Sequence, residues 1–258
     1  MATLNPQMSI QGNENTASII DVLSEVKPQE DTKDKQHHFS ITTDEIEEKD
    51  VAIQMLAVFI DELGGGFAEW IEPTSRILIQ LIGYEANDSI RNSVAGALPG
   101  LIKCAKEANP NVELLVNMGR TYLDSIWKAV QNETETDTMI CQVQAMKEII
   151  DEVGAGFLDQ TTVDALYKQL VDMYYKSGQR INENNELAKN EDRDEDDEEL
   201  DKDELEVIKE ENKNEYDLQL SIAEIIGIIF KTHSILSANI VTDLFSTLLT
   251  ETLQSEEK

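Results

Sequence analysis

Apolar residues recur every three or four positions in two regions of the chain, at about 44–181 and 216–254. This spacing places the apolar side chains along one face of an α-helix. No stretch shows the sustained alternation of apolar and polar positions that is typical of a β-strand. The apolar stretches pair into about four helical hairpins, which we expect at roughly 45–84, 88–131, 136–178 and 216–254.

Glycine and proline mark the ends and the irregular points of these predicted helices. Gly64 to Gly66 and Gly154 to Gly156 each follow an apolar stripe, and glycine readily adopts the left-handed conformation found after a helix C-terminus. Pro99 falls inside the third stripe, so we expect it to kink that helix. Thr42 and Glu45 have the spacing of a capping box at the start of the first helix.

Two distant segments share a sequence pattern. Residues 54–67 align with residues 144–157, and seven of the 14 positions are identical. Each copy runs from the end of a predicted helix through a glycine turn to a phenylalanine, Phe67 or Phe157. Because another helix pair lies between the copies, the period is about 45 residues, the length of HEAT and armadillo repeats. We therefore predict an all-α fold, a HEAT-repeat α-solenoid or armadillo-like superhelix, because a single hairpin cannot cover its own apolar stripe.

The segment from Asp88 to Pro99 favours HEAT repeats over other helix pairs. It contains an aspartate, an apolar residue, Arg91 and several alanines before the proline, which resembles the first helix of a HEAT repeat. In HEAT proteins the aspartate and the arginine form a ladder between adjacent repeats. Two roles for Arg91 remain open: it belongs to such a ladder, or it lies on a solvated helix face.

Residues 182–217 have a different composition, with 18 acidic and five basic side chains. Between Ala188 and Glu204 the only large apolar residue is Leu200, so this segment buries too little apolar surface to offset the entropy of ordering. We therefore divide the chain into a polar tail or linker at 1–43, repeats 1–3 at 44–181, a disordered acidic insertion at 182–215, and repeat 4 with a tail at 216–258.

The acidic insertion contains a dense run of carboxylates, namely Asp192, Asp194, Glu195, Asp196, Asp197, Glu198 and Glu199. One interpretation is a solvated loop without a binding role. Another is a site that attracts lysine- and arginine-rich segments of a partner protein, since exposed charges accelerate association more than they raise affinity. Calcium binding is a third alternative, but the run lacks an Asp-x-Asp-x-Asp-Gly loop.

The chain of 258 residues carries 52 acidic and 21 basic side chains, a formal net charge of −31. This charge argues against nucleic acid and anionic membranes as partners, because both attract clustered lysine and arginine, and it favours basic protein partners. We expect no transmembrane helix, because no run of 18 apolar residues occurs. Cys104 and Cys141 fit a reducing compartment as small buried side chains, with a disulfide or a reactive thiol as the alternative.

No arrangement of residues predicts catalysis, so we assign no catalytic residue, metal site or cofactor. The glycines at 64–66 are not followed by the Lys-Ser/Thr of a phosphate-binding loop. The carboxylate pairs at 61–62 and 151–152 recur at equivalent repeat positions, which favours surface or capping roles over acid–base chemistry. Trp70 and Trp127 either pack in the core or serve as exposed anchors for a partner.

A run near the start of the first repeat, and the order of the features that follow it, resemble a known family. The run extends from Phe39 to Leu56, with the sequence Phe-Ser-Ile-Thr-Thr-Asp-Glu-Ile-Glu-Glu-Lys-Asp-Val-Ala-Ile-Gln-Met-Leu. The similarity continues through Glu62-Leu63, Gly66-Phe67 and the segment from Asp88 to Pro99, to an acidic insertion at 186–206 and a helix that begins at Tyr216. Over about residues 39–253 the chain resembles the C-terminal half of importin-beta-3 type karyopherins, in the importin-beta family.

This resemblance implies a nuclear transport receptor rather than an enzyme, present in the cytoplasm, in the nucleus and at the nuclear pore. Such receptors bind cargo, RanGTP and the Phe-Gly repeats of nucleoporins on HEAT surfaces. The expected cargo here has basic segments, such as nuclear localisation signals, ribosomal proteins or histones. RanGTP binding is not implied for this chain alone, because it lacks the N-terminal repeats that hold most RanGTP contacts. Residues 1–38 also lack the tryptophan-bearing acidic stretch expected just upstream. The alternative is a HEAT-repeat scaffold subunit of another complex.

Overall fold

The computed structural model describes residues 43–189 and 202–242. These residues are predominantly α-helical, and no β-strand occurs among them. The chain divides into two compact units, an N-terminal unit up to Ala108 and a C-terminal unit that begins at Asn109.

The N-terminal unit contains α2 (Thr43–Leu63), the 3-10 helix η1 (Gly64–Trp70), α3 (Ile71–Leu81) and α4 (Asp88–Ala108). The first three elements all pack on α4, and Leu56, Phe67 and Leu98 are fully buried in this core. Gly100 of α4 allows close approach to α2, because a Cβ atom at this position would lie 2.7 Å from the Cγ2 atom of Ile60.

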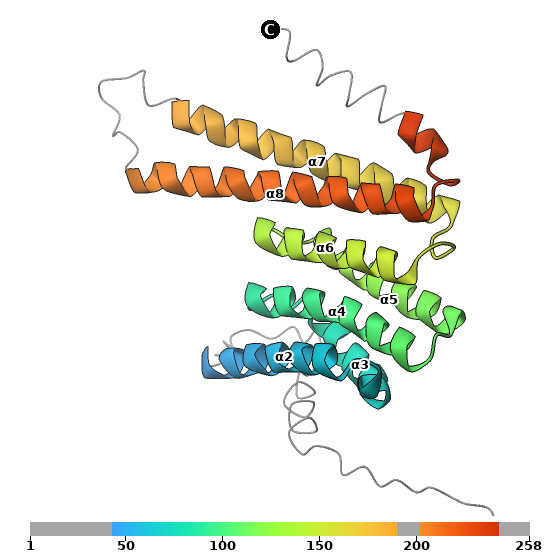
Figure 1. Cartoon of the computed structure of the whole chain (residues 1–258). Helices are drawn as coiled ribbons and strands as arrows, with labels where there is room; N and C mark the ends of the chain where they lie inside the picture. The colour runs from blue at the N-terminus through green and yellow to red at the C-terminus, as the bar shows by residue number, and fades with distance from the viewer. Residues whose placement is uncertain (1–42, 190–201, 243–258) are drawn as a thin grey trace, which may run out of the picture. The chain divides into compact units, whose positions relative to one another are not determined.

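The C-terminal unit contains α5 (Val112–Val130), α6 (Thr136–Val153), α7 (Gln160–Lys189) and α8 (Lys202–Thr232). α6 packs on both α5 and α8, and α7 packs along α8, as Figure 1 shows. The core of this unit includes the fully buried side chains of Val143, Ile150, Leu170 and Ile225. A short helical stretch at 238–242 follows α8.

In both units the first helix of one predicted hairpin packs against the first helix of the next, α2 against α4 and α6 against α8. In the C-terminal unit the contacting pairs Thr136–Glu215, Lys147–Glu224 and Asp151–Lys231 advance together along both helices, so α6 and α8 run parallel. Parallel stacking of equivalent helices is the arrangement of hairpin repeats. It confirms the predicted fold class, an all-α HEAT-like solenoid.

The prediction of a disordered insertion at 182–215 is wrong for both ends of that segment. α7 does not end near Gly178 but continues to Lys189, and α8 begins at Lys202 rather than near Tyr216. Figure 1 shows the two helices extending together beyond the start of α6. The carboxylate run between them lies outside the described residues, as do the tail at 1–42, the proposed cap residue Thr42 and residues 243–258.

Polar contacts between α7 and α8 explain why this segment is helical. The Nδ2 atom of Asn184 donates a hydrogen bond to Oδ1 of Asn212 at 3.1 Å, and Nδ2 of Asn212 donates to Oδ1 of Asn185 at 3.1 Å. Glutamate and lysine also have high helix propensity. Apolar burial alone therefore underestimates the stability of a helix that a neighbouring helix supports through polar side chains.

One helical stretch, Glu45–Leu81, has the length and mean hydropathy to cross a membrane, although it contains no uninterrupted apolar run of that length. The stretch includes α2, η1 and α3. Leu56, Ile60 and Leu78 are buried in the N-terminal unit, whereas Val51, Met55, Val58 and Leu63 of α2 are exposed. Core helices of globular units meet the same criterion, so these helices contribute to the core described above.

Candidate functional site

The two predicted repeat turns both contain glycines with positive φ angles but differ in conformation, because the turn after α2 is the 3-10 helix η1 and the turn after α6 is irregular. Gly64, Gly154 and Gly156 adopt positive φ angles of 47°, 81° and 82°, a region that residues with a side chain rarely occupy. Phe67 and Phe157 follow these turns and are fully buried. The repeated glycine–phenylalanine pattern therefore anchors the turn after α2 and the turn after α6 to the cores of their units.

The HEAT-like segment lies in α4. Asp88 is exposed at the start of the helix, whereas Arg91 is only 8% exposed and donates a hydrogen bond from Nη1 to the carbonyl oxygen of Tyr84 at 3.0 Å. The solvated-face interpretation of Arg91 is therefore wrong, and the ladder between repeats stays a prediction. Pro99 is buried, and α4 continues on both sides of it. Gly66 lies in η1 without a positive φ angle.

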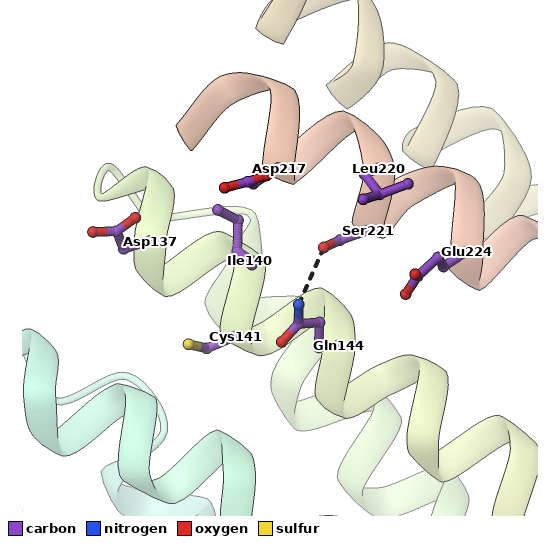
Figure 2. Close-up of a pocket in the computed structure, with 8 residues that line it drawn as sticks. All are labelled: Asp137, Ile140, Cys141, Gln144, Asp217, Leu220, Ser221 and Glu224. Atoms are coloured by element: carbon purple, nitrogen blue, oxygen red, sulfur yellow. Dashed lines mark hydrogen bonds between the residues drawn. The ribbon is translucent and has the colours of Figure 1, made fainter. Parts of the chain in front are cut away.

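A groove of about 350 Å³ lies between α6 and α8 (Figure 2). Its walls are formed by Asp137, Ile140, Cys141 and Gln144 of α6 and by Asp217, Leu220, Ser221 and Glu224 of α8. On each helix these residues have the spacing i, i+3, i+4 and i+7, which places them on one face. Gln144 donates a hydrogen bond from Nε2 to Oγ of Ser221 at 3.4 Å across the groove.

The two ends of the groove differ in charge. At one end the Nζ atom of Lys147 lies 2.7 Å from Oε2 of Glu224, so an ion pair offsets that carboxylate. At the other end Asp137 and Asp217 form no hydrogen bond or ion pair with another described residue. The charges of these two aspartates also act on Lys213. The pKa of Lys213 is raised mainly by its hydrogen bond and ion pair with Glu210, and to a smaller extent by the charges of Asp217 and Asp137. This end of the groove is therefore acidic.

An ion pair between the partly exposed Arg180 and the buried Glu215 holds the acidic end in position. The side chain of Glu215 is 4% exposed and accepts two hydrogen bonds from Arg180, Nε to Oε1 at 2.6 Å and Nη2 to Oε2 at 2.7 Å. The hydroxyl of Thr136 donates to the same Oε1 atom at 3.0 Å. Because Thr136 precedes Asp137 and Glu215 lies two residues before Asp217, this cluster links α6, α7 and α8 beside the two groove aspartates.

The turn between α6 and α7 is connected to the end of α8. The backbone N–H of Leu158 donates a hydrogen bond to Nε2 of the buried His233 at 3.1 Å. The Nη2 atom of Arg120 on α5 donates to the carbonyl oxygen of Phe157 at 3.3 Å. α8 is thus held to the start of α6 through Glu215 and to the turn after α6 through His233, on either side of the groove.

The groove offers binding contacts rather than a chemical centre. Burial, followed by the charge of Asp137, raises the pKa of the Cys141 thiol, so this thiol is protonated at neutral pH and is a weak nucleophile. Both cysteines are free. In the described part of the chain no group of three or more histidine, cysteine or carboxylate side chains is arranged to hold a metal ion. What remains is a pair of carboxylates next to the apolar side chains of Ile140 and Leu220.

The other predicted candidates have simpler roles. Asp151, from the second carboxylate pair, lies 3.0 Å from Nζ of Lys231 and links α6 to α8 at the surface. Trp70 and Trp127 are both partly exposed, so neither fits entirely the core or the anchor interpretation. The acidic run at 192–199 lies outside the described residues, and its binding role stays a prediction.

The groove was not predicted from the sequence, although the sequence contains a signal for it. The segments Asp-x-x-Ile-Cys-x-x-Gln at 137–144 and Asp-x-x-Leu-Ser-x-x-Glu at 217–224 share one pattern. An aspartate is followed at helical spacing by an aliphatic residue, a small residue and a polar residue. The pattern predicts a groove only when the two helices, which are distant in the sequence, are known to pack side by side.

A comparison with protein families points to the same part of the chain. Residues 138–252 match the family model named Importin repeat 6. The matched region begins one residue after Asp137 and covers most of α6 together with α7 and α8, the helices that build and support the groove. Importin repeats are a transport or scaffold type of sequence and not an enzyme family. The match supports a relationship of this chain to the importin-beta family.

Proposed function

We propose that this chain is part of an importin-beta-like nuclear transport receptor that binds basic segments of protein cargo and moves between cytoplasm and nucleus. The observation that carries the proposal is the Importin repeat 6 match over residues 138–252. The stacked helical hairpins and the net charge of −31 are consistent with it.

The proposed mechanism has two stages. The negative field of the chain first attracts a lysine- or arginine-rich segment, which raises the rate of encounter and is screened by salt. Several weak contacts along the helices then hold the segment, and their combined strength exceeds that of each contact alone. In this proposal the carboxylates at 192–199 contribute mainly to attraction. Phe-Gly repeats of nucleoporins are a further proposed partner, whereas direct RanGTP binding is not part of the proposal.

The test measures binding of the full chain to a peptide of alternating lysine and glycine, over a range of ionic strength. We expect binding that weakens steeply with salt. A variant with amides in place of the six carboxylates from Asp194 to Glu199 should bind more slowly and show a smaller salt dependence. The matched control changes six exposed glutamates of the N-terminal unit to glutamine: Glu45, Glu47, Glu48, Glu62, Glu69 and Glu85.

The outcome separates two kinds of helical repeat protein. A transport receptor for basic cargo binds the isolated peptide, and the variant changed at 194–199 is affected more than the control. A scaffold subunit of another complex ignores the peptide and instead forms a stoichiometric complex with one folded partner. Absence of peptide binding by the unmodified chain at low salt would overturn the proposal.

A further inference from the structure

We infer that the groove between α6 and α8 binds a single lysine or arginine side chain from an extended segment of a partner protein, and that Lys213 competes for its acidic end. The inference rests on the proposed function, because it assigns one specific contact to the basic cargo. It differs in kind from the general attraction by the run at 192–199, since it concerns one cavity with defined walls.

Charge is the first argument. Asp137 and Asp217 come from different helices and border the same end of the groove (Figure 2). Neither forms a hydrogen bond or ion pair with another described residue, in contrast to Glu224, which Lys147 neutralises at 2.7 Å. An ammonium or guanidinium group placed between the two aspartates would meet two carboxylates without displacing an existing ion pair.

The shape and polarity of the walls are the second argument. Ile140 and Leu220 provide apolar surface beside the aspartates, and long basic side chains lay their methylene groups along such surface while the charged end stays in water. The volume of about 350 Å³ is at the lower end of the range of ligand pockets, about 300–1,000 Å³. An aromatic side chain fits this groove less well, because it would desolvate carboxylates without pairing them.

The polar atoms in the middle of the groove suit an extended backbone. The hydroxyl of Ser221, which is only 3% exposed, accepts a hydrogen bond from the exposed amide of Gln144. The second N–H of this amide is left to donate to a carbonyl oxygen of the bound segment. The Oε1 atom of Gln144 is an acceptor for a backbone N–H. One basic side chain and the backbone next to it can therefore be held together.

Lys213 is the third argument, because it lies one helical turn before Asp217 on α8. Its Nζ atom lies 2.8 Å from Oε1 of Glu210, and the charges of Asp217 and Asp137 contribute to its raised pKa. From this position the charge of Lys213 opposes that of Asp217 through space, although its ion pair is with Glu210. An incoming basic side chain has to compete with it, which reduces the apparent affinity of the groove.

The first experiment measures the affinity of the full chain for the lysine–glycine peptide. Asp137→Asn with Asp217→Asn should weaken binding about three- to tenfold, from the loss of two exposed charge pairs. The control pair Asp164→Asn with Glu206→Gln changes the net charge equally at exposed positions outside the groove and should have a smaller effect. Lys213→Gln should strengthen binding about two- to fivefold, whereas Lys209→Gln, one turn earlier on α8, should change it less.

The second experiment tests whether the bound lysine side chain of the peptide lies in the groove. Cys141 lines the groove and is free, so a peptide with a pyridyl disulfide next to its lysine should form a mixed disulfide with this thiol. The thiolate of Cys141 attacks the peptide sulfur and releases pyridine-2-thione. We expect this reaction to be several times faster than with a glutamine peptide, and the acceleration to disappear in Asp137→Asn with Asp217→Asn. Buried Cys104 serves as an internal control for unfolding.

The outcomes distinguish the inference from the proposed function. If the peptide binds in a salt-dependent manner but neither the groove variants nor Cys141 respond, the groove inference is wrong and the proposed function stands. If the unmodified chain binds no basic peptide, both are wrong. Equal acceleration with an aromatic peptide that lacks lysine would also overturn the inference, because it would show an apolar rather than a charged preference. Arginine peptides should behave as lysine peptides do.

Discussion

The Nε2 atom of His233 accepts a hydrogen bond from the backbone N–H of Leu158 at 3.1 Å, and so joins the end of α8 to the turn that follows α6. The other ring nitrogen, Nδ1, lies 2.7 Å from the hydroxyl of Thr232, which donates its own proton to the carbonyl oxygen of Ile228. Nδ1 must therefore carry the proton, and the imidazole is neutral. If the ring were protonated, its Nε2–H group would point at the backbone N–H of Leu158, and two donors would face each other.

The first prediction concerns pH. Burial lowers the pKa of His233 below its ordinary value of 6.5, so the unfolded chain binds a proton more readily than the folded chain. The stability that the neutral ring contributes is fully present above pH 6.5 and is lost as the pH falls towards the folded pKa. We expect the free energy of unfolding of the native protein, relative to His233→Gln, to be constant above this pH and to fall below it.

Denaturant titrations of both proteins across this pH range test the prediction. The many carboxylates titrate in both proteins, so their contribution cancels in the difference. A difference that stays constant, or that grows as the solution becomes more acidic, would show that His233 does not accept the hydrogen bond in the neutral form.

The second prediction concerns two glycines inside helices. A Cβ atom on Gly119 of α5 would lie 2.8 Å from Cγ2 of Val153 and 3.0 Å from Cε2 of Phe157. Gly119→Ala should therefore destabilise the C-terminal unit by about 1–3 kcal/mol, because the extra methyl group overpacks the contact with α6. Gly227→Ala in α8 is the control, since its Cβ atom would have no neighbour within 4 Å.

For Gly227→Ala we expect stabilisation by about 0.5–1 kcal/mol, from the loss of glycine's flexibility in a helix. Thermal or denaturant unfolding of the two variants provides the comparison. We expect Gly119→Ala to lower the free energy of unfolding and Gly227→Ala to raise it. Equal changes in the two variants would contradict the close packing of α5 on α6.

The third prediction concerns the ion pair between Arg180, whose side chain is 38% exposed, and the buried Glu215. Arg180→Met leaves a carboxylate that is 4% exposed without its bidentate partner, which should cost about 2–3 kcal/mol of unfolding free energy. Lys176→Met, one turn away on α7, removes an ion pair with Asp172 whose side chains are both 64% exposed. That loss should be at most about 0.5 kcal/mol.

A double variant, Arg180→Met with Glu215→Leu, isolates the cause. It removes the unpaired charge, so it should be more stable than Arg180→Met alone. If instead the two losses add, the cost of Arg180→Met comes from lost packing and not from a stranded carboxylate. Urea unfolding of Arg180→Met, Glu215→Leu, the double variant and the control Lys176→Met supplies the numbers.

The fourth prediction concerns the extended ends of α7 and α8. Asn212→Ala removes both hydrogen bonds to the asparagines at 184 and 185. The expected loss is about 1–2 kcal/mol of local stability, or roughly five- to thirtyfold faster amide exchange at 181–189 and 203–211. Exchange in α6 should be unchanged, because the contact lies beyond it.

Asn214→Ala is the control, because Asn214 forms no hydrogen bond with another described residue. Rapid exchange of these ends in the unmodified protein would contradict the helical assignment and would support the disordered insertion that the composition suggested.

Several features of this protein were determined by the sequence itself. The spacing of Leu56, Ile60 and their equivalents Met146 and Ile150 requires helices, and the glycine–phenylalanine repeat requires that equivalent hairpins stack. Both are local or periodic properties. The apolar stripe of each helix must be shielded from water, whichever neighbouring helix shields it. The fold class therefore follows from the sequence alone.

Tertiary structure decided the rest. Composition predicted disorder around Asn184 and Asn212, but each amide finds its partner on the opposite helix, and a polar partner has no periodic signature in the sequence. The groove has the same origin. Asp137 and Asp217 are unremarkable exposed carboxylates on separate helices, and they form one acidic site only because α6 and α8 pack in parallel. The sum of their fields depends on distance, which only the folded chain defines.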